Sequence, residues 1–217
     1  TIPAVYSARI ALAKRTGEAV MKLIKRNLRP RDILTPAALK NAESVDMAIG
    51  ASSNSILHLL ALASELGFSK EQISVDTMNE ISAKTPNLCR LAPAGEYYIE
   101  ELDEAGGIPA VIGTLIDADL FDGSAMTVGC QTQEELTENA YVKNPEIIRP
   151  VALPYSPYGG LAILKGNLAK EGAVVKKSAV DKKMYRHSGP ARVFDSEEEA
   201  MKAISGNQIH AGDVVVI

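Results

Sequence analysis

The chain has 217 residues, of which 46% are hydrophobic and 23% charged, and its formal net charge at pH 7 is −4. These values are typical of a globular protein with one large or two small domains, and the mild negative charge argues against binding to nucleic acid or anionic membranes. No apolar run reaches the ~18 residues of a membrane span, the N-terminus lacks a secretory-signal pattern, and two cysteines are too few for a disulfide framework. We therefore expect a cytoplasmic protein with reduced thiols.

The first two thirds of the chain are predicted to be helical. Apolar residues recur at helical spacing over residues 4–27, with Gly17 as a candidate break. A second helix is expected to begin at Thr35 as N-cap, with Pro36 in its first turn, and to end at Gly50. Shorter helices are predicted over residues 77–84, 96–105 and 109–117, and a capping box over TQEE at residues 132–135.

Residues 50–67, GASSNSILHLLALASELG, place three small polar residues in front of an apolar helix that stops at Gly67. The apolar positions share one helix face: Ile56, Leu59, Leu60, Ala63 and Leu66. Ser52, Ser53 and Asn54 can each cap this helix. The amides of the same helix start can instead accept a carboxylate or phosphate. From the residues alone, a simple N-cap is the more economical interpretation.

The histidines and cysteines offer little chemistry by their spacing. His58 lies between leucines, so we expect a buried, hydrogen-bonded histidine rather than a ligand. His187 and His210 fall in predicted loops. Cys89 and Cys130 have no C-x-x-C partner, and we expect each to be a small buried apolar residue rather than a metal ligand.

The sequence changes character near residue 145. Residues 144–160, NPEIIRPVALPYSPYGG, contain four prolines and two glycines, which indicates a loop or domain boundary. The two glycines allow the backbone to approach another segment closely, and Gly166-Asn167 predicts a tight turn between strands. One helix is expected over residues 196–204. Strand-like runs follow the boundary: LAILKG (161–166), GAVVKKS (172–178), ARVF (191–194) and DVVVI (213–217).

Segments in the same order along the whole chain match the pattern of one known family. They are GASSNSILHLLA (50–61), TPNLCRLAPAGEYYIEELDEAGGIPAVI (85–112), IIRP (147–150), YSPYGGLAILKGNLAKEGAVVKKSAVD (155–181), GPARVFDSEEEAMKAI (189–204) and GDVVVI (212–217). In these segments the chain resembles the dihydroxy-acid dehydratase and 6-phosphogluconate dehydratase family, and the dihydroxy-acid branch in particular. The resemblance implies an α/β fold. Residues 1–146 would be the helix-rich C-terminal part of a three-layer α/β/α domain, and residues 147–217 the first part of a β-barrel domain of the swivelling type.

The resemblance also implies a reaction. Members of this family remove water from a 2,3-dihydroxy carboxylic acid to give a 2-keto acid, a step of branched-chain amino acid biosynthesis in the dihydroxy-acid branch. An iron–sulfur cluster acts as Lewis acid on the leaving hydroxyl, and Mg²⁺ holds the carboxylate end. The alternatives are a sugar-acid or 6-phosphogluconate dehydratase and a non-catalytic module that binds small anions.

The chain departs from the family pattern at its metal and catalytic motifs. The Cys-Asp-Lys and Cys-Gly-Gly-Met motifs of the cluster, the Glu-Gly-Pro motif of a metal ligand and the serine-bearing segment do not occur. We therefore expect an internal fragment of a longer enzyme, without metal ligands or a catalytic base, that binds no cofactor alone and is inactive. Ser52, Ser53 and Asn54 are predicted to bind the hydroxy-acid substrate, and the protein is expected to form a homo-oligomer.

Overall fold

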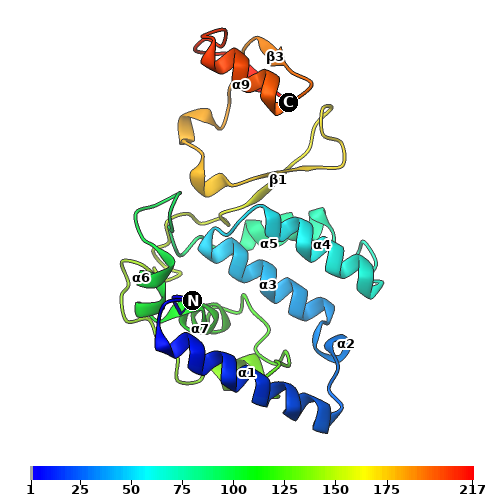
Figure 1. Ribbon diagram of the computed structural model, residues 1–217, viewed down its shortest axis with the longest axis vertical. Coiled ribbons are helices and arrows are strands. Elements are labelled where there is room, and N and C mark those ends of the chain that lie inside the picture. The colour runs from blue at the N-terminus through cyan, green and yellow to red at the C-terminus, as the bar shows by residue number, and fades with distance from the viewer. Residues whose placement is uncertain (1) are drawn as a thin grey trace. The chain divides into compact units, whose positions relative to one another are not determined.

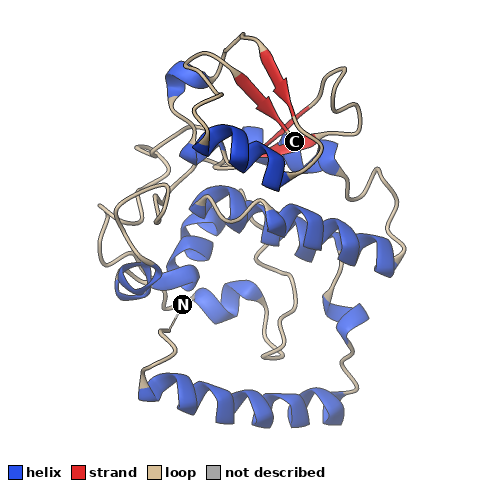
Figure 2. Cartoon of the chain, turned by 45° about the horizontal axis from the view of Figure 1, so that its top comes forward, coloured by secondary structure: helices blue, strands red, loops and turns tan. Residues whose placement is uncertain are grey.

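The computed structural model describes residues 2–217, and it is mostly helical (Figure 1). The chain divides into two compact units, the first ending at Ala179 and the second spanning Val180–Ile217. Helices dominate the first unit, and short strands occur near its end and in the second unit (Figure 2). Within the described chain, no helix has both the length and the apolar character needed to span a bilayer.

The first unit contains eight α-helices, one short 3-10 helix, η1 (Lys177–Ala179), and one pair of strands among its described residues. The α-helices and strands are α1 (Ser7–Arg26), α2 (Pro30–Ile33), α3 (Pro36–Ile49), α4 (Asn54–Leu66), α5 (Val75–Lys84), α6 (Ile99–Glu104), α7 (Gly107–Asp117), α8 (Gln133–Thr137), β1 (Ala162–Leu164) and β2 (Ala173–Val175). Most of these elements lie within a few residues of the predicted helices and strand-like runs, but α2 is not among the predicted helices.

Local capping chemistry sets several helix ends, as predicted. The Thr35 hydroxyl accepts a hydrogen bond from the Ala38 amide at 3.2 Å, and Gly50 ends α3 in the left-handed conformation with φ 63°. The capping box of α8 is formed between Thr132 and Glu135. The break considered at Gly17 is wrong because α1 continues through it. One glycine costs a helix only about 1 kcal/mol, which is too little to interrupt 20 residues.

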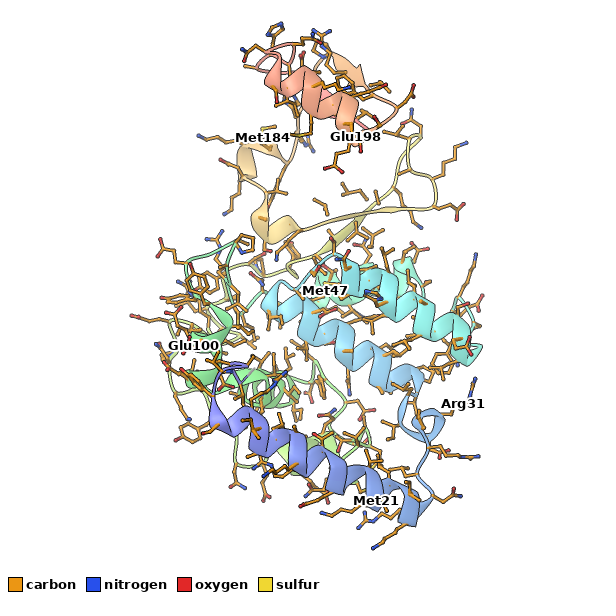
Figure 3. All side chains as sticks on the ribbon, in the orientation of Figure 1. Met21, Arg31, Met47, Glu100, Met184 and Glu198 are labelled. Atoms are coloured by element: carbon orange, nitrogen blue, oxygen red, sulfur yellow. The ribbon has the colours of Figure 1, made fainter. Side chains whose placement is uncertain are left out.

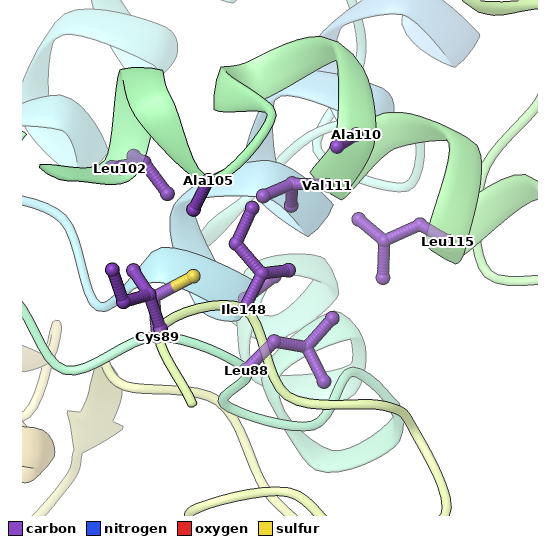
Figure 4. Packing of buried hydrophobic residues seen from close by; sticks show 10 residues of the cluster. Leu88, Cys89, Leu102, Ala105, Ala110, Val111, Leu115 and Ile148 are labelled. Carbon is purple, nitrogen blue, oxygen red and sulfur yellow. The ribbon is translucent and has the colours of Figure 1, made fainter. Parts of the chain in front are cut away.

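Two apolar clusters form the core of the first unit, and α3 contributes to both. One cluster packs α6 and α7 against the segments around Leu88 and Ile148 (Figure 4). The other cluster packs α4, α5 and β1 against Leu39 and Met47 of α3. Since Ala48 belongs to the first cluster, opposite sides of α3 join the two halves of the core.

The hairpin of β1 and β2 is antiparallel, with Ala162 opposite Val175. The tight turn predicted at Gly166-Asn167 is wrong, because the strands are joined by the longer loop 165–172. The register pairs Leu164 with Ala173, so both turn residues lie well outside the ladder. Lys165 at the start of this loop forms an ion pair with Asp76 of α5, which holds the loop against that helix.

The second unit is a small strand–helix–strand motif. After a short 3-10 helix, η2 (Lys182–Met184), it consists of β3 (Ala191–Val193), α9 (Glu197–Ser205) and β4 (Val214–Val216). The two strands are parallel, with Ala191 opposite Val214. The helix between them is the crossover that parallel strands require. Its N-cap is Ser196, whose hydroxyl accepts from the Glu199 amide at 3.2 Å.

Residues 2–217 as described contain sheets of two strands only. The three-layer domain, the β-barrel and their boundary at residues 146/147 therefore stay predictions about a longer protein. The predicted boundary lies inside the first compact unit, because the β1–β2 hairpin packs on α5 through Ile163 and Val174.

Glu43 of α3 is fully buried, with 0% of its surface exposed, and neither carboxylate oxygen has a hydrogen-bond partner among the described residues. Burial raises the pKa of Glu43 from 4.5 to about 7, while Lys40 lowers it and Asp46 raises it further. The folded chain therefore holds this proton more tightly than the unfolded chain.

This burial predicts an unusual pH dependence of stability. The contribution of protonated Glu43 to the free energy of unfolding is fully present below pH 4.5 and is lost as the pH rises toward about 7. At about 1.4 kcal/mol per pKa unit, the loss amounts to roughly 3 kcal/mol. The free energy of unfolding, measured with denaturant from pH 4.5 to 8, should fall by this amount in the wild type and not in Glu43→Gln. Glu65→Gln changes an exposed carboxyl on α4 and should show the same fall as the wild type. The prediction is contradicted if Glu43→Gln and the wild type lose the same free energy over this pH range.

Candidate functional site

Ser52, Ser53 and Asn54 lie in the short connection between α3 and α4. Gly50 reverses the chain at the end of α3, and the Ala51 amide donates to the Asp46 carbonyl at 3.1 Å. The polar residues therefore sit beside the C-terminus of one helix and at the N-terminus of the next. Both ends carry backbone groups that need partners outside their own helix.

Ser52 caps α4, whereas Ser53 and Asn54 do not. The Ser52 hydroxyl accepts from the Asn54 amide at 3.3 Å, and the Ser52 carbonyl accepts from both the amide and the hydroxyl of Ser55. Ser53 occupies the N-cap position with helical backbone angles, and its side chain makes no capping bond. Within residues 2–217 the hydroxyl of Ser53 and the side-chain amide of Asn54 are not engaged by other groups, so they remain available to a ligand.

Gly159 and Gly160 bring a distant segment against the end of α3. The Gly160 amide donates to the Met47 carbonyl at 2.9 Å. A Cβ at Gly160 would lie 2.4 Å from the Gly50 Cα, and one at Gly159 would lie 2.8 Å from the Met47 Cβ. The predicted close backbone approach at these glycines is confirmed, and the segment it meets is the base of the Ser52–Asn54 connection.

Asn87 secures the same helix end from a second direction. Its side chain is 2% exposed, and its amide nitrogen donates to the carbonyls of Ala48 at 3.1 Å and Met47 at 3.4 Å. The Asn87 backbone amide donates to Ser156 at 2.9 Å. Asn87 was missed by sequence reasoning, because nothing in TPNLC shows that its side chain reaches a helix some 40 residues away.

Ser178 was also missed, and it adds a polar group next to Gly50. Its amide donates to the Gly160 carbonyl at 3.0 Å, which places its hydroxyl 3.0 Å from the position of a Gly50 Cβ. The hydroxyl oxygen is buried and has no partner in the described chain. In the last turn of α3 the Asp46 carboxyl is half-buried, so burial raises its pKa, and a hydrogen bond with the Ser55 hydroxyl offsets part of that rise.

The other candidates lie apart from this connection. The prediction that His58 is buried is wrong: it is exposed because it lies two residues, or about 200° around α4, from the buried Ile56. His187 and His210 are in loops of the second unit, as predicted.

Cys89 is buried as expected, and burial raises the pKa of its thiol to about 12. Cys130 is only half-buried, in a turn with φ 60°, so that prediction is wrong.

The residues present do not fit an iron–sulfur cluster or a divalent ion. In the part of the chain that the structure describes, no three His, Cys, Asp or Glu side chains gather at one point. The thiol of Cys89 is buried in the core, and a thiol with a pKa near 12 is a poor source of the thiolate that a cluster requires.

An open cavity of about 770 Å³ lies at the other end of α4. Its walls come from the C-terminal half of α4, the N-terminus of α5 and the β1–β2 loop, and their charges are of both signs. The charged lining residues are Lys70, Glu71, Asp76, Glu80, Lys165, Lys170 and Glu171. Ser52, Ser53 and Asn54 are not part of this cavity.

The chain belongs to the dihydroxy-acid/6-phosphogluconate dehydratase family. The N-terminal region of the family matches residues 1–137, and its C-terminal region matches residues 146–217. Over its whole length of 217 residues, the chain is 56% identical to a dihydroxy-acid dehydratase of Clostridium kluyveri. Over the same length it is 55% identical to the dihydroxy-acid dehydratases of Clostridium beijerinckii and Moorella thermoacetica. The chain spans only 38–39% of the length of these relatives.

The glycine contact predicts a sharp difference between two similar substitutions. Gly160→Ala places a Cβ inside the van der Waals distance of Gly50, whereas Gly166→Ala meets nothing within 4 Å. Overpacking costs about 1–3 kcal/mol, so Gly160→Ala should lower the free energy of unfolding by that amount. Denaturant unfolding measures both variants. An equal stability of Gly160→Ala and Gly166→Ala would contradict the packing described for the end of α3.

Proposed function

We propose that this chain is part of a dihydroxy-acid dehydratase, a hydro-lyase that converts a 2,3-dihydroxy carboxylic acid to a 2-keto acid in branched-chain amino acid biosynthesis. The observation that carries the proposal is the 56% identity, over all 217 residues, to a relative of that name. The family description also includes 6-phosphogluconate dehydratases, but the relatives reported above are all dihydroxy-acid dehydratases.

In this proposal Ser52, Ser53 and Asn54 bind the substrate at the N-terminus of α4. The Ser53 hydroxyl and the Asn54 side-chain amide can both donate hydrogen bonds, and neither is used in capping the helix. The helix dipole favours a negative group at this end, which suits the carboxylate of a hydroxy acid. The contacts of Gly160 and Asn87 with the end of α3 would hold these donors in place before the substrate arrives.

The remaining parts of the activity belong, in this proposal, to the rest of a longer protein. An iron–sulfur cluster and Mg²⁺ would supply the Lewis-acid chemistry, with ligands outside residues 1–217. We propose that the full-length protein is a cytoplasmic homo-oligomer with a three-layer α/β/α domain and a swivelling β-barrel domain. The chain by itself is proposed to be inactive, because residues 2–217 as described bring together no three His, Cys, Asp or Glu side chains that could hold either metal group.

The substrate role is tested in the full-length protein with its cofactors restored. Ser53→Ala and Asn54→Ala should each reduce kcat/KM by roughly tenfold to a hundredfold, since a hydrogen bond to a charged group contributes about 1.5–3 kcal/mol. Stability should change little, because neither side chain caps α4. Activity is compared on a 2,3-dihydroxy acid and on 6-phosphogluconate.

The control for this experiment is Ser64→Ala, which removes an exposed hydroxyl from the same helix. Unchanged turnover in the Ser53 and Asn54 variants would refute the substrate role. Preference for 6-phosphogluconate would assign the chain to the other branch of the family, and binding of small acids without turnover would support a non-catalytic module.

A further inference from the structure

Arg90, Arg149 and Tyr155 come together on the first unit, and we call these three residues the arginine cluster. The guanidinium carbon of Arg149 lies 3.9 Å from the centre of the Tyr155 ring, and that of Arg90 lies 5.7 Å from the same centre. Both distances are within the range in which a cation interacts with an aromatic ring. One tyrosine therefore gathers two positive charges from segments that are far apart in the sequence.

Backbone hydrogen bonds bring the segments of the arginine cluster together. The Arg149 amide donates to the Leu88 carbonyl at 2.9 Å, and the Tyr155 amide donates to the Asn87 carbonyl at 3.0 Å. The Tyr155 hydroxyl donates to the Glu146 carbonyl at 2.6 Å, which fixes the ring. Leu88 is fully buried in the core. The cluster is thus anchored to the core of the first unit without the help of a ligand.

Neither guanidinium of the cluster has a hydrogen-bond acceptor or an ion-pair partner within residues 2–217. Other arginines of the described chain do have one. Arg31, labelled in Figure 3, donates to the Glu65 carbonyl at 3.3 Å and lies 4.0 Å from the Glu65 carboxylate. Arg149 is half-buried, so part of its hydration is lost. A guanidinium offers five N–H donors, and withdrawing it from water is costly unless acceptors replace the water.

Carboxylates in the neighbourhood do not neutralise the cluster. Burial raises the pKa of Tyr97, and its neighbour Tyr155 raises it further. The charges of Glu146 and Glu96 add to this rise, so both carboxyls lie in the same region. Both residues are exposed, and in the described chain neither forms an ion pair with an arginine of the cluster. Water and salt weaken exposed charges that are not in contact, so the two guanidiniums keep their positive potential.

The chemistry of the cluster favours a small anion with several oxygens. Guanidinium groups present parallel N–H donors that bind carboxylate and phosphate oxygens in pairs. An anion bound to two such groups also offsets the repulsion between their like charges. A polyanion such as nucleic acid is not favoured, since the chain has a net charge of −4.

We propose that the arginine cluster is a binding site for a small oxyanion, with a phosphate or carboxylate group bound by Arg90 and Arg149. The cluster contains no residue of the connection between α3 and α4, so this site is separate from the proposed substrate site at Ser53 and Asn54. The proposal does not depend on the proposed function, and failure of one leaves the other standing.

The test is calorimetric titration of the full-length protein with inorganic phosphate, and a parallel titration with acetate distinguishes the two classes of anion. Arg90→Gln and Arg149→Gln should each weaken anion binding by roughly tenfold or more, because each removes charge-assisted hydrogen bonds. Arg90 is exposed, so its variant tests the site even if Arg149→Gln disturbs the fold. Binding of either anion with this dependence on the two arginines supports the proposal.

Arg15→Gln is the matched control, because it removes the same charge from an exposed arginine of α1. Its affinity for the anion should equal that of the wild type, and so should the affinity of Ser53→Ala. Loss of binding in Ser53→Ala would assign the anion to the N-terminus of α4 and would overturn the proposal. Two other results would also overturn it: a wild type that binds neither anion, or an Arg15→Gln variant that loses as much affinity as Arg90→Gln.

Discussion

The contact between the backbones of Gly50 and Gly160 is the constraint on which the candidate site depends. It is possible only because Gly160 has no Cβ, since a Cβ there would lie 2.4 Å from the Gly50 Cα. Through this contact the Gly160 amide reaches the Met47 carbonyl, while Asn87 reaches the neighbouring Ala48 carbonyl. Three segments that are far apart in the sequence thus meet at one helix end, and they satisfy carbonyls that the helix itself leaves unpaired.

The position of the polar connection follows from this packing. Because α3 is fixed on both sides by the two apolar clusters, the point at which the chain leaves it is also fixed. Ser52 then satisfies the first turn of α4, which leaves the side chains of Ser53 and Asn54 without a structural task. The proposed binding role of these two residues is compatible with the packing, since neither side chain is needed to cap α4.

Local signals in the sequence were sufficient for most helices and for the strand-like runs. Thr35, Gly50 and the Thr132 capping box act within a few residues, so their effect can be read directly. The exposure of His58 follows from its angle to the buried Ile56 on the same helix, so periodicity could have predicted it. The length of the β1–β2 loop and the reach of Asn87 depend instead on partners distant in the chain. Local periodicity contains no information on such partners. The candidate site came from resemblance, because three small polar residues before a helix equally describe a cap.

The parallel pair of β3 and β4 has a consequence for the second unit. In residues 180–217 each of these strands has one neighbour, so each also has a free edge. The unpaired amides and carbonyls along such edges can accept another strand, but both strands have only three residues and β3 carries the charged Arg192, and these features limit uncontrolled pairing. The unit can therefore extend into a larger sheet only by gaining further strands at these edges.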